Sequence, residues 1–467
     1  MVVILSLSCS GGLTLRLFGS SGVRGLANVE LTAVLAEQVG SAVATFTKAK
    51  EVLVARDARV SGAMLQDALV SGLESGGANV KCLGVIPTPV LAFLTKKMRA
   101  DAGVMITASH NPPEYNGIKI FDRDGLAYDE ESQEMIERII AHRRFRLADW
   151  EFVGHDQFAD KTSLYVEDIE KSVKLCRKWH VVVDAGCGAT FSLAPTVLQG
   201  LGCKVTALNA QPDGLFPARS PEPNAKSLTN LAAVVKTLST DAGLAYDGDG
   251  DRVAFIDEKG HFADFDQVLA AYAAYVVKEN GGGTVVTSVE ASMAVEKMVE
   301  RQGGKVVRTR VGDVYIVELM KKRNAIFGGE PCGAWIHPQL NYCPDGILSS
   351  ALLLKALEDE NESLAEFVAE TPKYPILRQN FSLKNDLKEK AVEKIGERLK
   401  TVFQTYREFS KVDGVRLVLE KGWLLVRASG TEPAIRLTVE GESLKAAREI
   451  MEKGAQSIRN LLGNGDI

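Results

Sequence analysis

A chain of 467 residues has room for between two and five domains of the usual size of roughly 100–200 residues, which excludes a single small binding module. The composition is 46% hydrophobic and 25% charged with 15 prolines, which excludes a disordered or low-complexity protein. The formal net charge of −5 provides no general attraction to nucleic acid or to an anionic membrane. We therefore expect any anionic ligand to be held by a local site.

The chain shows no sign of a membrane segment or of disulfide bonds. Its longest apolar run, residues 268–277, is about half of the ~20 residues that a membrane-spanning helix needs. The apolar first twelve residues have no basic residue before the apolar run, so we expect a first strand or an irregular extension rather than a signal peptide. Seven scattered cysteines without C-x-x-C spacing indicate neither a disulfide framework nor a zinc site. We expect a cytoplasmic monomer or homodimer that binds neither nucleic acid nor membrane.

Apolar strand-like runs alternate with amphipathic helix-length segments over most of the chain, which is typical of α/β units. In chain order, we expect the first strands and helices at 51–55, 61–73, 79–83, 89–98 and 102–107, with Ser61 as a helix N-cap. Further strands are expected at 179–184, 243–246, 253–257 and 283–288. The pattern predicts three successive α/β blocks.

The last part of the chain has a different pattern. One strand is followed by a long charged helix at 386–403, strands at 415–419, 423–427 and 435–440, and a closing helix. Strands that follow one another in sequence indicate an antiparallel α+β domain. We place the domain boundaries near residues 158, 258 and 372, which predicts domains 1–158, 159–258, 259–372 and 373–467.

The first candidate loop follows the strand at 102–107 and contains Ser109, His110 and Asn111. Ligands of α/β sheets bind outside the carboxyl ends of strands, so Ser109 is well placed to face a cleft. Lys119 can return beside it, as a cation for a phosphate or as a proton carrier. The structural alternative is a turn that Ser109 or Asn111 shapes before two prolines.

The second candidate loop is the acidic segment at 247–252. Asp247, Asp249 and Asp251 alternate with glycines between two apolar strands, so their carboxylates can converge on one hard cation such as Mg²⁺. A calcium-binding EF-hand fits poorly, because Arg252 occupies the position that requires glycine and the flanking segments are strand-like. A solvated acidic turn is the structural alternative. Metal binding is favoured, because four charges in six residues exceed what a turn needs.

Two further loops carry candidate ligand-binding groups. Glu330 lies in the glycine-rich segment 327–335 and can accept hydrogen bonds from sugar hydroxyls, although an ordinary tight turn explains this segment equally well. The segment 427–436 combines Arg427, Arg436, two hydroxyls and a glycine, which together make a phosphate-binding loop plausible. The alternative is that these arginines pair with surface carboxylates.

Six motifs in chain order resemble the α-D-phosphohexomutase family over nearly the whole chain. They are Phe18-Gly-Ser-Ser-Gly-Val-Arg24-Gly, Arg56-Asp-Ala-Arg59, Thr107-Ala-Ser109-His-Asn-Pro, Asp247-Gly-Asp-Gly-Asp-Arg252, Gly329-Glu-Pro-Cys-Gly333 and Arg427-Ala-Ser-Gly-Thr-Glu-Pro433. The resemblance implies three similar mixed α/β domains and a C-terminal α+β domain of TATA-box-binding-protein-like fold around a central cleft.

The resemblance also implies a role for each motif. Ser109 would be the serine that carries phosphate, and it would hold Mg²⁺ together with Asp247, Asp249 and Asp251. Arg24, His110 and Lys119 would surround the transferring phosphoryl group. Substrate binding would involve two sets of residues: Arg252, Gly312, Asp313, Glu330 and Cys332, and at the non-reacting phosphate Arg427, Ser429, Gly430, Thr431 and Arg436.

The implied reaction interconverts hexose 1-phosphates and 6-phosphates through phosphoserine and a hexose 1,6-bisphosphate, which also serves as activator. The first and last motifs favour the branch that converts glucosamine 6-phosphate into glucosamine 1-phosphate, with phosphomannomutase or phosphoglucomutase activity as the alternative. More distant alternatives are a magnesium-dependent sugar phosphatase with Asp247 as nucleophile and a non-catalytic phosphosugar sensor. Ser109 and the absence of a suitably placed threonine argue against the phosphatase.

The sugar loop departs from the family pattern Gly-Glu-x-Ser-Gly-His. Cys332 replaces the serine and Ala334 replaces the histidine. A thiol is a weaker hydrogen-bond donor than a hydroxyl, and alanine can neither move a proton nor bind a hydroxyl. Two interpretations of His337, three residues further on, stay open: compensation for the missing histidine, or a structural histidine.

Overall fold

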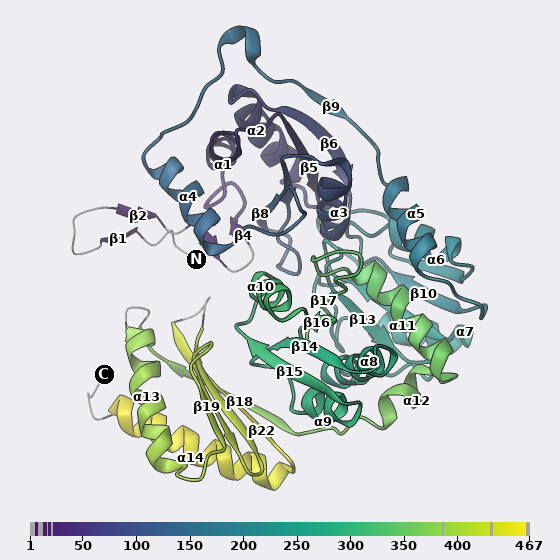
Figure 1. Ribbon diagram of the computed structural model, residues 1–467, viewed down its shortest axis with the longest axis vertical. Helices are drawn as coiled ribbons and strands as arrows, with labels where there is room; N and C mark the ends of the chain where they lie inside the picture. Colours follow the sequence, from purple (N-terminus) through teal and green to yellow (C-terminus); the bar gives the residue numbers. More distant parts are fainter. Residues whose placement is uncertain are drawn as a thin grey trace. The chain divides into compact units, whose positions relative to one another are not determined.

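The computed structural model describes residues 5–7, 13–15, 17–19, 22–384, 387–429 and 433–463 (Figure 1). The chain divides into two compact units. The first comprises residues 1–265, 312–318 and 327–369, and the second comprises residues 266–311, 319–326 and 370–467. None of the helices in the described part of the chain is long and apolar enough to cross a membrane.

The first α/β block is built on a seven-stranded mixed sheet with the strand order β3-β4-β8-β7-β5-β6-β9. Its strands are β3 (Phe18–Gly19), β4 (Gly22–Leu26), β5 (Glu51–Arg56), β6 (Asn79–Val85), β7 (Ala102–Ile106), β8 (Tyr115–Asp122) and β9 (Asp156–Phe158). Its helices are α1 (Ala33–Thr47), α2 (Gly62–Ser75), α3 (Thr88–Met98), α4 (Glu130–Ala141) and the 3₁₀ turn Trp150–Phe152. The short strands β1 (Leu5–Leu7) and β2 (Leu13–Leu15) form a separate antiparallel pair.

Strand β5 is covered on both faces, which explains its continuous apolar sequence. Val52 and Val54 belong to the core cluster that α1, α2 and α4 complete. Leu53 and Ala55 are equally buried but point to the opposite face, where α3 packs on β5 and β7. Buried central strands of this kind read as apolar runs without alternation.

The second α/β block has a four-stranded sheet with the order β11-β10-β12-β13. Its elements are α5 (Ser163–Ser172), β10 (His180–Asp184), α6 (Leu193–Gly200), β11 (Lys204–Leu208), α7 (Thr229–Leu238), β12 (Ala242–Tyr246) and β13 (Val253–Ile256). Strand β10 is parallel to β11 and β12, whereas β13 returns antiparallel to β12. The acidic segment 247–252 is the connection between β12 and β13.

The following segment contains two strand pairs. Strands β14 (Gly283–Ser288) and β15 (Gly304–Thr309) are parallel. In the chain, α8 (Phe265–Glu279) precedes β14, α9 (Ala294–Arg301) connects the two strands, and α10 (Asp313–Arg323) follows β15. Strands β16 (Phe327–Gly329) and β17 (Trp335–Ile336) are antiparallel and precede α11 (Gly346–Glu360) and α12 (Leu364–Ala369). The candidate sugar loop joins β16 to β17.

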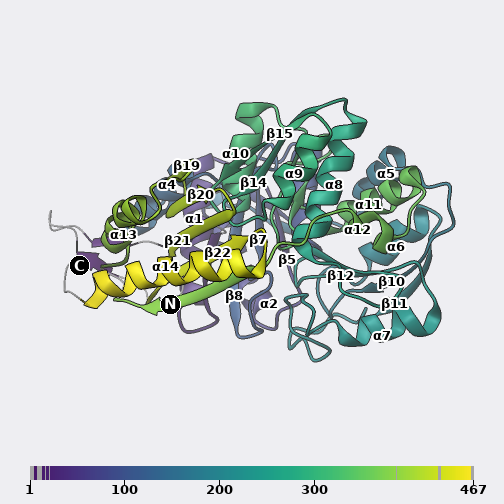
Figure 2. The same cartoon turned by 90° about the horizontal axis from the view of Figure 1, so that it is seen from below.

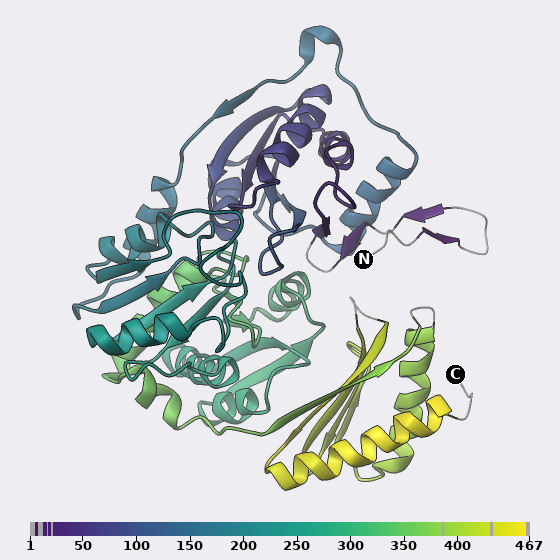
Figure 3. The ribbon, with the colours of Figure 1, turned by 180° about the vertical axis from the view of Figure 1, so that it is seen from behind.

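The C-terminal part is an antiparallel five-stranded sheet with the order β18-β22-β21-β20-β19. Its elements are β18 (Ile376–Ser382), α13 (Lys388–Val402), β19 (Glu408–Ser410), β20 (Val415–Leu419), β21 (Gly422–Ala428), β22 (Ala434–Gly441) and α14 (Leu444–Gly463). Helices α13 and α14 cover one face of this sheet, and a single apolar cluster joins both helices to it (Figures 2 and 3).

Most of the expected elements are confirmed within a few residues, and the C-terminal sheet is antiparallel as expected. The N-cap expectation for Ser61 is wrong. Ser61 has helical backbone angles and makes no capping bond, and its hydroxyl accepts a hydrogen bond from Asn116 at 2.9 Å instead. The expected helix start at Asp386 lies outside the described residues, and strand β19 was not expected.

Candidate active site

Ser109 lies in the serine loop, which we define as residues 107–114 between β7 and β8. It is 1% exposed and has a φ of +50°, a left-handed conformation that is costly for a residue other than glycine. Its Oγ donates to Asp247 Oδ2 at 2.6 Å, and it also lies 3.5 Å from Asp251 Oδ1 and 3.3 Å from His110 Nδ1. The loop therefore directs the serine hydroxyl at the acidic segment.

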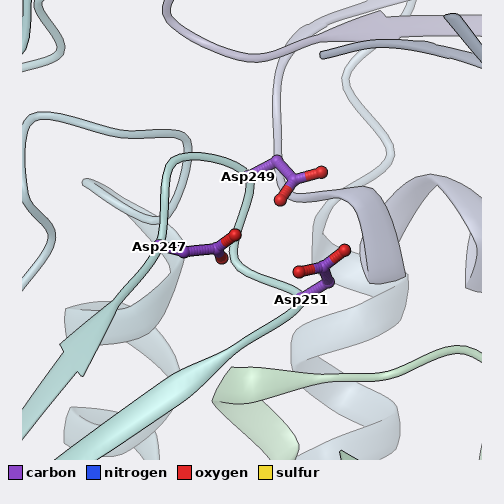
Figure 4. Close-up of side chains that lie close together, drawn as sticks. All are labelled: Asp247, Asp249 and Asp251. Carbon is purple, nitrogen blue, oxygen red and sulfur yellow. The ribbon is translucent and has the colours of Figure 1, made fainter. Parts of the chain in front are cut away.

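Asp247, Asp249 and Asp251 form a buried carboxylate trio (Figure 4). One oxygen of each carboxylate lies within 4.8 Å of the others. Gly250, with a φ of +75°, lets the chain turn so that its own N–H donates to Asp247 Oδ1 at 2.9 Å. Burial, together with the neighbouring Asp251 and Asp249, raises the pKa of Asp247 far above its usual range. Three carboxylates in this arrangement need positive charge.

Lys119 on β8 supplies part of that charge. Its ammonium group lies 2.7 Å from Asp251 Oδ2 and 3.1 Å from Asp249 Oδ2. Burial alone would lower the pKa of Lys119, but Asp249 and Asp251 outweigh burial and raise it. Lys119 is therefore a cation at neutral pH in this structure.

Asp249 has one oxygen fully used and one oxygen without a partner. Oδ2 accepts from the Thr88 hydroxyl at 2.5 Å and from Lys119, whereas the buried Oδ1 has no hydrogen-bond partner. A buried carboxylate oxygen without a partner costs free energy, and oxygen atoms are the ligands that Mg²⁺ prefers. The trio therefore fits a divalent cation, for which Oδ1 of Asp249 is the open ligand atom.

His110 lies beside the Ser109 hydroxyl, and Arg24 is bonded to the serine loop. Arg24 Nη1 donates to Asn111 Oδ1 at 2.7 Å, and its buried Nε has no hydrogen-bond partner. Burial, followed by the charges of Arg252 and Arg24, lowers the pKa of His110 to about 2. His110 is therefore a neutral imidazole beside Ser109, and Arg24 has an unused donor for an anion.

The glycine-rich loop places Glu330 against the start of α10. Glu330 Oε1 accepts from the Gly312 N–H at 3.1 Å, and the Glu330 N–H donates to the Ala334 carbonyl at 2.9 Å. Burial raises the pKa of the neighbouring Cys332 to about 12, so its thiol stays protonated at neutral pH. Asp313, the first residue of α10, also has its pKa raised by burial.

His337 lies in a buried polar network. Its Nε2 is 3.0 Å from Ser349 Oγ, and its ring centroid lies 5.5 Å from that of Phe327 with the two rings tilted by 42°. Ser349 Oγ donates to the Asp345 carbonyl, and both Asp345 carboxylate oxygens accept from Tyr165 at 2.9 Å. Burial lowers the pKa of His337 to about 3. These contacts favour the structural interpretation of His337.

We expect His337 to make the protein less stable in acid. Between its unfolded pKa of about 6.5 and its folded pKa, the unfolded chain binds a proton that the folded chain excludes. Lowering the pH from 7.5 to 5 should therefore cost wild type about 2 kcal/mol more than His337→Gln, which keeps a hydrogen-bonding group but does not titrate. Burial raises the pKa of Asp345 to about 6. Asp345 titrates in both proteins, so its contribution cancels from the difference in stability between them. Parallel pH dependence of the two apparent Tm values would contradict this.

The second unit contains the predicted phosphate-binding loop. Arg427 on β21 and Arg436 on β22 are directly paired across the sheet, so both side chains project from the same face. Arg427 forms ion pairs with Glu290 and with Asp413, the latter at 2.9 Å. The Lys388 ammonium donates to the Ser429 carbonyl. Gly430 and Thr431 lie outside the described residues.

Two residues that contact the candidate loops were not found from the sequence. Thr88 holds Asp249, and Asp413 accepts from the Val311 N–H at 3.0 Å as well as pairing with Arg427. Both contacts join segments more than 100 residues apart in the chain. The pair Thr88-Pro89 at the start of a helix is the single local signal, and it indicates helix geometry rather than a contact with Asp249.

A buried serine hydroxyl, three carboxylates and buried cations on an α/β scaffold are the groups that phosphoryl transfer requires. The sequence matches the phosphoglucomutase/phosphomannomutase α/β/α domain I over residues 15–147, domain II over 163–260, domain III over 264–374, and the C-terminal domain over 380–457. The chain belongs to the α-D-phosphohexomutase family, whose members are intramolecular phosphotransferases.

Individual relatives match over nearly their whole length. The chain is 42% identical to the phosphoglucosamine mutase of Methanocaldococcus jannaschii over 453 residues, which covers 96% of this chain and 99% of that protein. It is also 42% identical to the protein named probable phosphoglucosamine mutase of Pyrococcus abyssi over 447 residues, covering 96% and 98%. The crystal structure of a phosphoglucomutase/phosphomannomutase family protein from Burkholderia thailandensis superposes with a TM-score of 0.86 at 28% identity, covering 94% of this chain and 97% of that one.

Proposed function

We propose that this chain is a phosphoglucosamine mutase that interconverts glucosamine 6-phosphate and glucosamine 1-phosphate through phospho-Ser109 and the glucosamine 1,6-bisphosphate. The observation that carries the proposal is the 2.6 Å contact between Ser109 Oγ and Asp247 at the edge of the carboxylate trio. The choice of sugar rests on the names of the relatives that are about 42% identical over nearly the full chain.

Two phosphoryl transfers make up the proposed reaction. In the first, the bond between phosphorus and Ser109 Oγ breaks and a bond from phosphorus to a sugar hydroxyl oxygen forms. The proton that the sugar hydroxyl loses is matched by one that Ser109 Oγ takes up. The bisphosphate then turns around, and the second transfer returns its other phosphoryl group to Ser109. Arg24, through its unused Nε donor, and the cationic Lys119 neutralise charge on the transferring group. His110 lies close enough to the serine oxygen to hydrogen-bond with it.

Asp247, Asp249 and Asp251, together with an oxygen on Ser109, are the residues that would hold Mg²⁺. When bound, the cation would neutralise charge on the phosphoryl oxygens. The chain contributes the fixed positions of the three carboxylates, because backbone N–H groups hold Asp247 and the Thr88 hydroxyl holds Asp249.

The remaining candidates bind the substrate in this proposal. Glu330 accepts hydrogen bonds from sugar hydroxyls. Gly312 donates to Glu330 and is followed by Asp313, and the charge of Arg252 interacts with Glu330 and with Cys332. Arg427, Ser429, Gly430, Thr431 and Arg436 bind the phosphate that does not react. The cross-strand pairing of Arg427 with Arg436 supports this role, because it brings two arginines together on one face of the sheet. We also propose the four-domain division with boundaries near residues 158, 258 and 372.

Phosphorus NMR tests the proposed activity directly. Purified protein is incubated with Mg²⁺, a trace of hexose 1,6-bisphosphate, and the 1-phosphate of glucosamine, mannose or glucose in separate tubes. We expect a 6-phosphate signal to grow fastest with glucosamine 1-phosphate. Faster growth with mannose or glucose 1-phosphate would reassign the sugar, and growth of inorganic phosphate alone would favour a phosphatase. No change in any tube would overturn mutase activity on these sugars.

Replacing Arg427 with glutamine should weaken substrate binding more than it slows the chemical step. Charge-assisted hydrogen bonds are worth about 1.5–3 kcal/mol, so we expect KM for the sugar phosphate to rise by roughly 10- to 150-fold while kcat changes much less. Steady-state kinetics give both values. Arg407→Gln, at an exposed arginine directly before β19, is the matched control. An equal fall in kcat with unchanged KM would contradict the assigned role.

A further inference from the structure

The motif at residues 56–59 has no role in the mechanism above, yet the structure places it against the serine loop. Arg59 follows strand β5 and is 1% exposed. Its Nε donates to Asp57 Oδ2 at 3.0 Å. The two Nη atoms donate to three carbonyl oxygens of the serine loop and to the first carbonyl of β8. These are the carbonyls of Ser109 at 2.9 Å, Asn111 at 2.6 Å, Pro112 at 2.5 Å and Tyr115 at 2.9 Å. All five N–H groups of this guanidinium are therefore used.

The same residues close a hydrogen-bonded circuit around Ser109. The Ser109 N–H donates to Thr107 Oγ1 at 2.8 Å, and the Thr107 hydroxyl donates to Asp57 Oδ2 at 2.7 Å. Asp57 in turn accepts from both the backbone N–H and the Nε of Arg59. Arg59 then binds the Ser109 carbonyl. Both backbone polar groups of Ser109 are thus fixed, which holds the residue in its left-handed conformation.

This conformation determines where the hydroxyl points. A serine free to relax would leave the region of φ near +50°, because that region is costly for residues with a Cβ. A change in φ would alter the direction of the Cα–Cβ bond of Ser109 and move its Oγ away from Asp247. A planar group with five donors can hold four carbonyls at fixed angles, whereas a lysine ammonium has three donors and no fork geometry.

We propose that Arg59 is a positioning residue for phosphoryl transfer, which holds the serine loop so that Ser109 faces the carboxylate trio. The inference rests on the proposed function, because it assigns Ser109 the reacting role. A displacement of about 1 Å at a reacting group can cost roughly 100-fold in rate. The five side-chain donors of Arg59 are used by Asp57 and by carbonyls of residues 109–115, so its loss should act on kcat rather than on KM.

Arg308 offers a matched control in the second unit. It is also paired with a carboxylate, Glu296 at 2.6 Å, and it donates to the carbonyls of Ser288, Ala291 and Ser292. Replacement of Arg308 by lysine therefore removes the same type of pair without touching the serine loop. A general loss of stability should appear in both variants, whereas a loss of positioning should appear in Arg59→Lys alone.

Hydrogen exchange and kinetics on the full-length chain test the proposal together. In Arg59→Lys we expect faster deuterium uptake in peptides that cover 107–117, slower phosphorylation of Ser109 by hexose bisphosphate in intact-mass spectra, and a kcat lowered by about 10- to 100-fold at unchanged KM. Arg308→Lys should leave uptake at 107–117 unchanged. In Arg59→Ala, low millimolar guanidinium chloride should restore part of kcat, whereas sodium chloride should not.

The readouts separate failure of this inference from failure of the proposed function. Unchanged uptake at 107–117 in Arg59→Lys overturns the positioning role, whatever the enzyme does. Unchanged kcat despite faster uptake overturns it as well. Wild type without mutase activity, combined with faster uptake in Arg59→Lys, overturns the proposed function and leaves the structural role of Arg59 supported. If Arg59→Lys does not fold, guanidinium rescue of Arg59→Ala decides.

Discussion

Replacing Ser109 with alanine is expected to lower mutase turnover by more than about 10³-fold, because no phosphoenzyme can then form. Two other hydroxyls near the trio are already engaged elsewhere, because the Thr88 hydroxyl is bonded to Asp249 and the Thr107 hydroxyl to Asp57. Intact-mass spectra should show one added phosphoryl group on wild type after incubation with hexose bisphosphate and none on Ser109→Ala. Phosphorus NMR measures the turnover.

Ser172→Ala is the matched control, because this exposed hydroxyl bonds to a carbonyl of its own helix and should leave turnover intact. Ser109→Ala also separates the competing functions. Hydrolysis that persists in Ser109→Ala would support a phosphatase with an aspartate nucleophile, and unchanged sugar-phosphate binding without any turnover in wild type would support a sensor. Either result would contradict the mutase.

The strands were predictable because burial on both faces leaves a plain signature in the sequence. All five residues of β7 and of β12 are buried, so each appears as an apolar run followed at once by polar residues. Strand β19 was missed because it has three residues at the edge of its sheet and no apolar run. The expected cap at Ser61 failed because a hydroxyl can satisfy a distant partner, here Asn116, as well as its own helix.

The carboxylate trio was predictable for a different reason. Its three members lie within five residues on one glycine-rich turn, so local sequence alone brings them together. The residues that hold them were not predictable, because Thr88 and Lys119 reach Asp249 across 161 and 130 residues of chain. His337 shows the same limit. Its position near the sugar loop left two roles open, and only its contact with Ser349 favours one.

Two buried arginine–carboxylate pairs and one partly buried pair share one arrangement. Arg59 pairs with Asp57, Arg219 with Asp184 at 2.9 Å and Arg308 with Glu296, and each arginine also donates to loop carbonyls. Arg219 holds the Tyr246 carbonyl, directly before Asp247. Buried ion pairs add little net stability compared with apolar packing, so their value lies in fixing a conformation. Arg59 fixes the serine loop and Arg219 fixes the chain directly before the carboxylate trio, whereas Arg308 fixes the turn after β14 in the second unit.

Asp249→Asn is expected to weaken divalent cation binding more than any change outside the trio, because it removes the charge of the carboxylate whose Oδ1 has no hydrogen-bond partner. It also leaves the Lys119 ammonium with one carboxylate partner fewer. Titration calorimetry with Mg²⁺ or Mn²⁺ measures this without reference to activity. Asp160→Asn, at an exposed carboxylate bonded to Thr162, should bind the cation as wild type does.

Thr88→Val refines the same test, because valine has the shape of threonine without the hydroxyl. The Thr88 N–H would still bind the Asp249 carbonyl at 2.9 Å, so the backbone of the acidic segment 247–252 should stay in place. Only the Asp249 carboxylate loses a hydrogen bond that fixes its orientation. Groups that orient metal ligands are typically worth 10–100-fold in affinity, so we expect a loss of about this size, smaller than that of Asp249→Asn. Unchanged cation affinity in Asp249→Asn would refute the trio as the metal site, whereas unchanged affinity in Thr88→Val alone would show that Lys119 and the turn already hold the carboxylate.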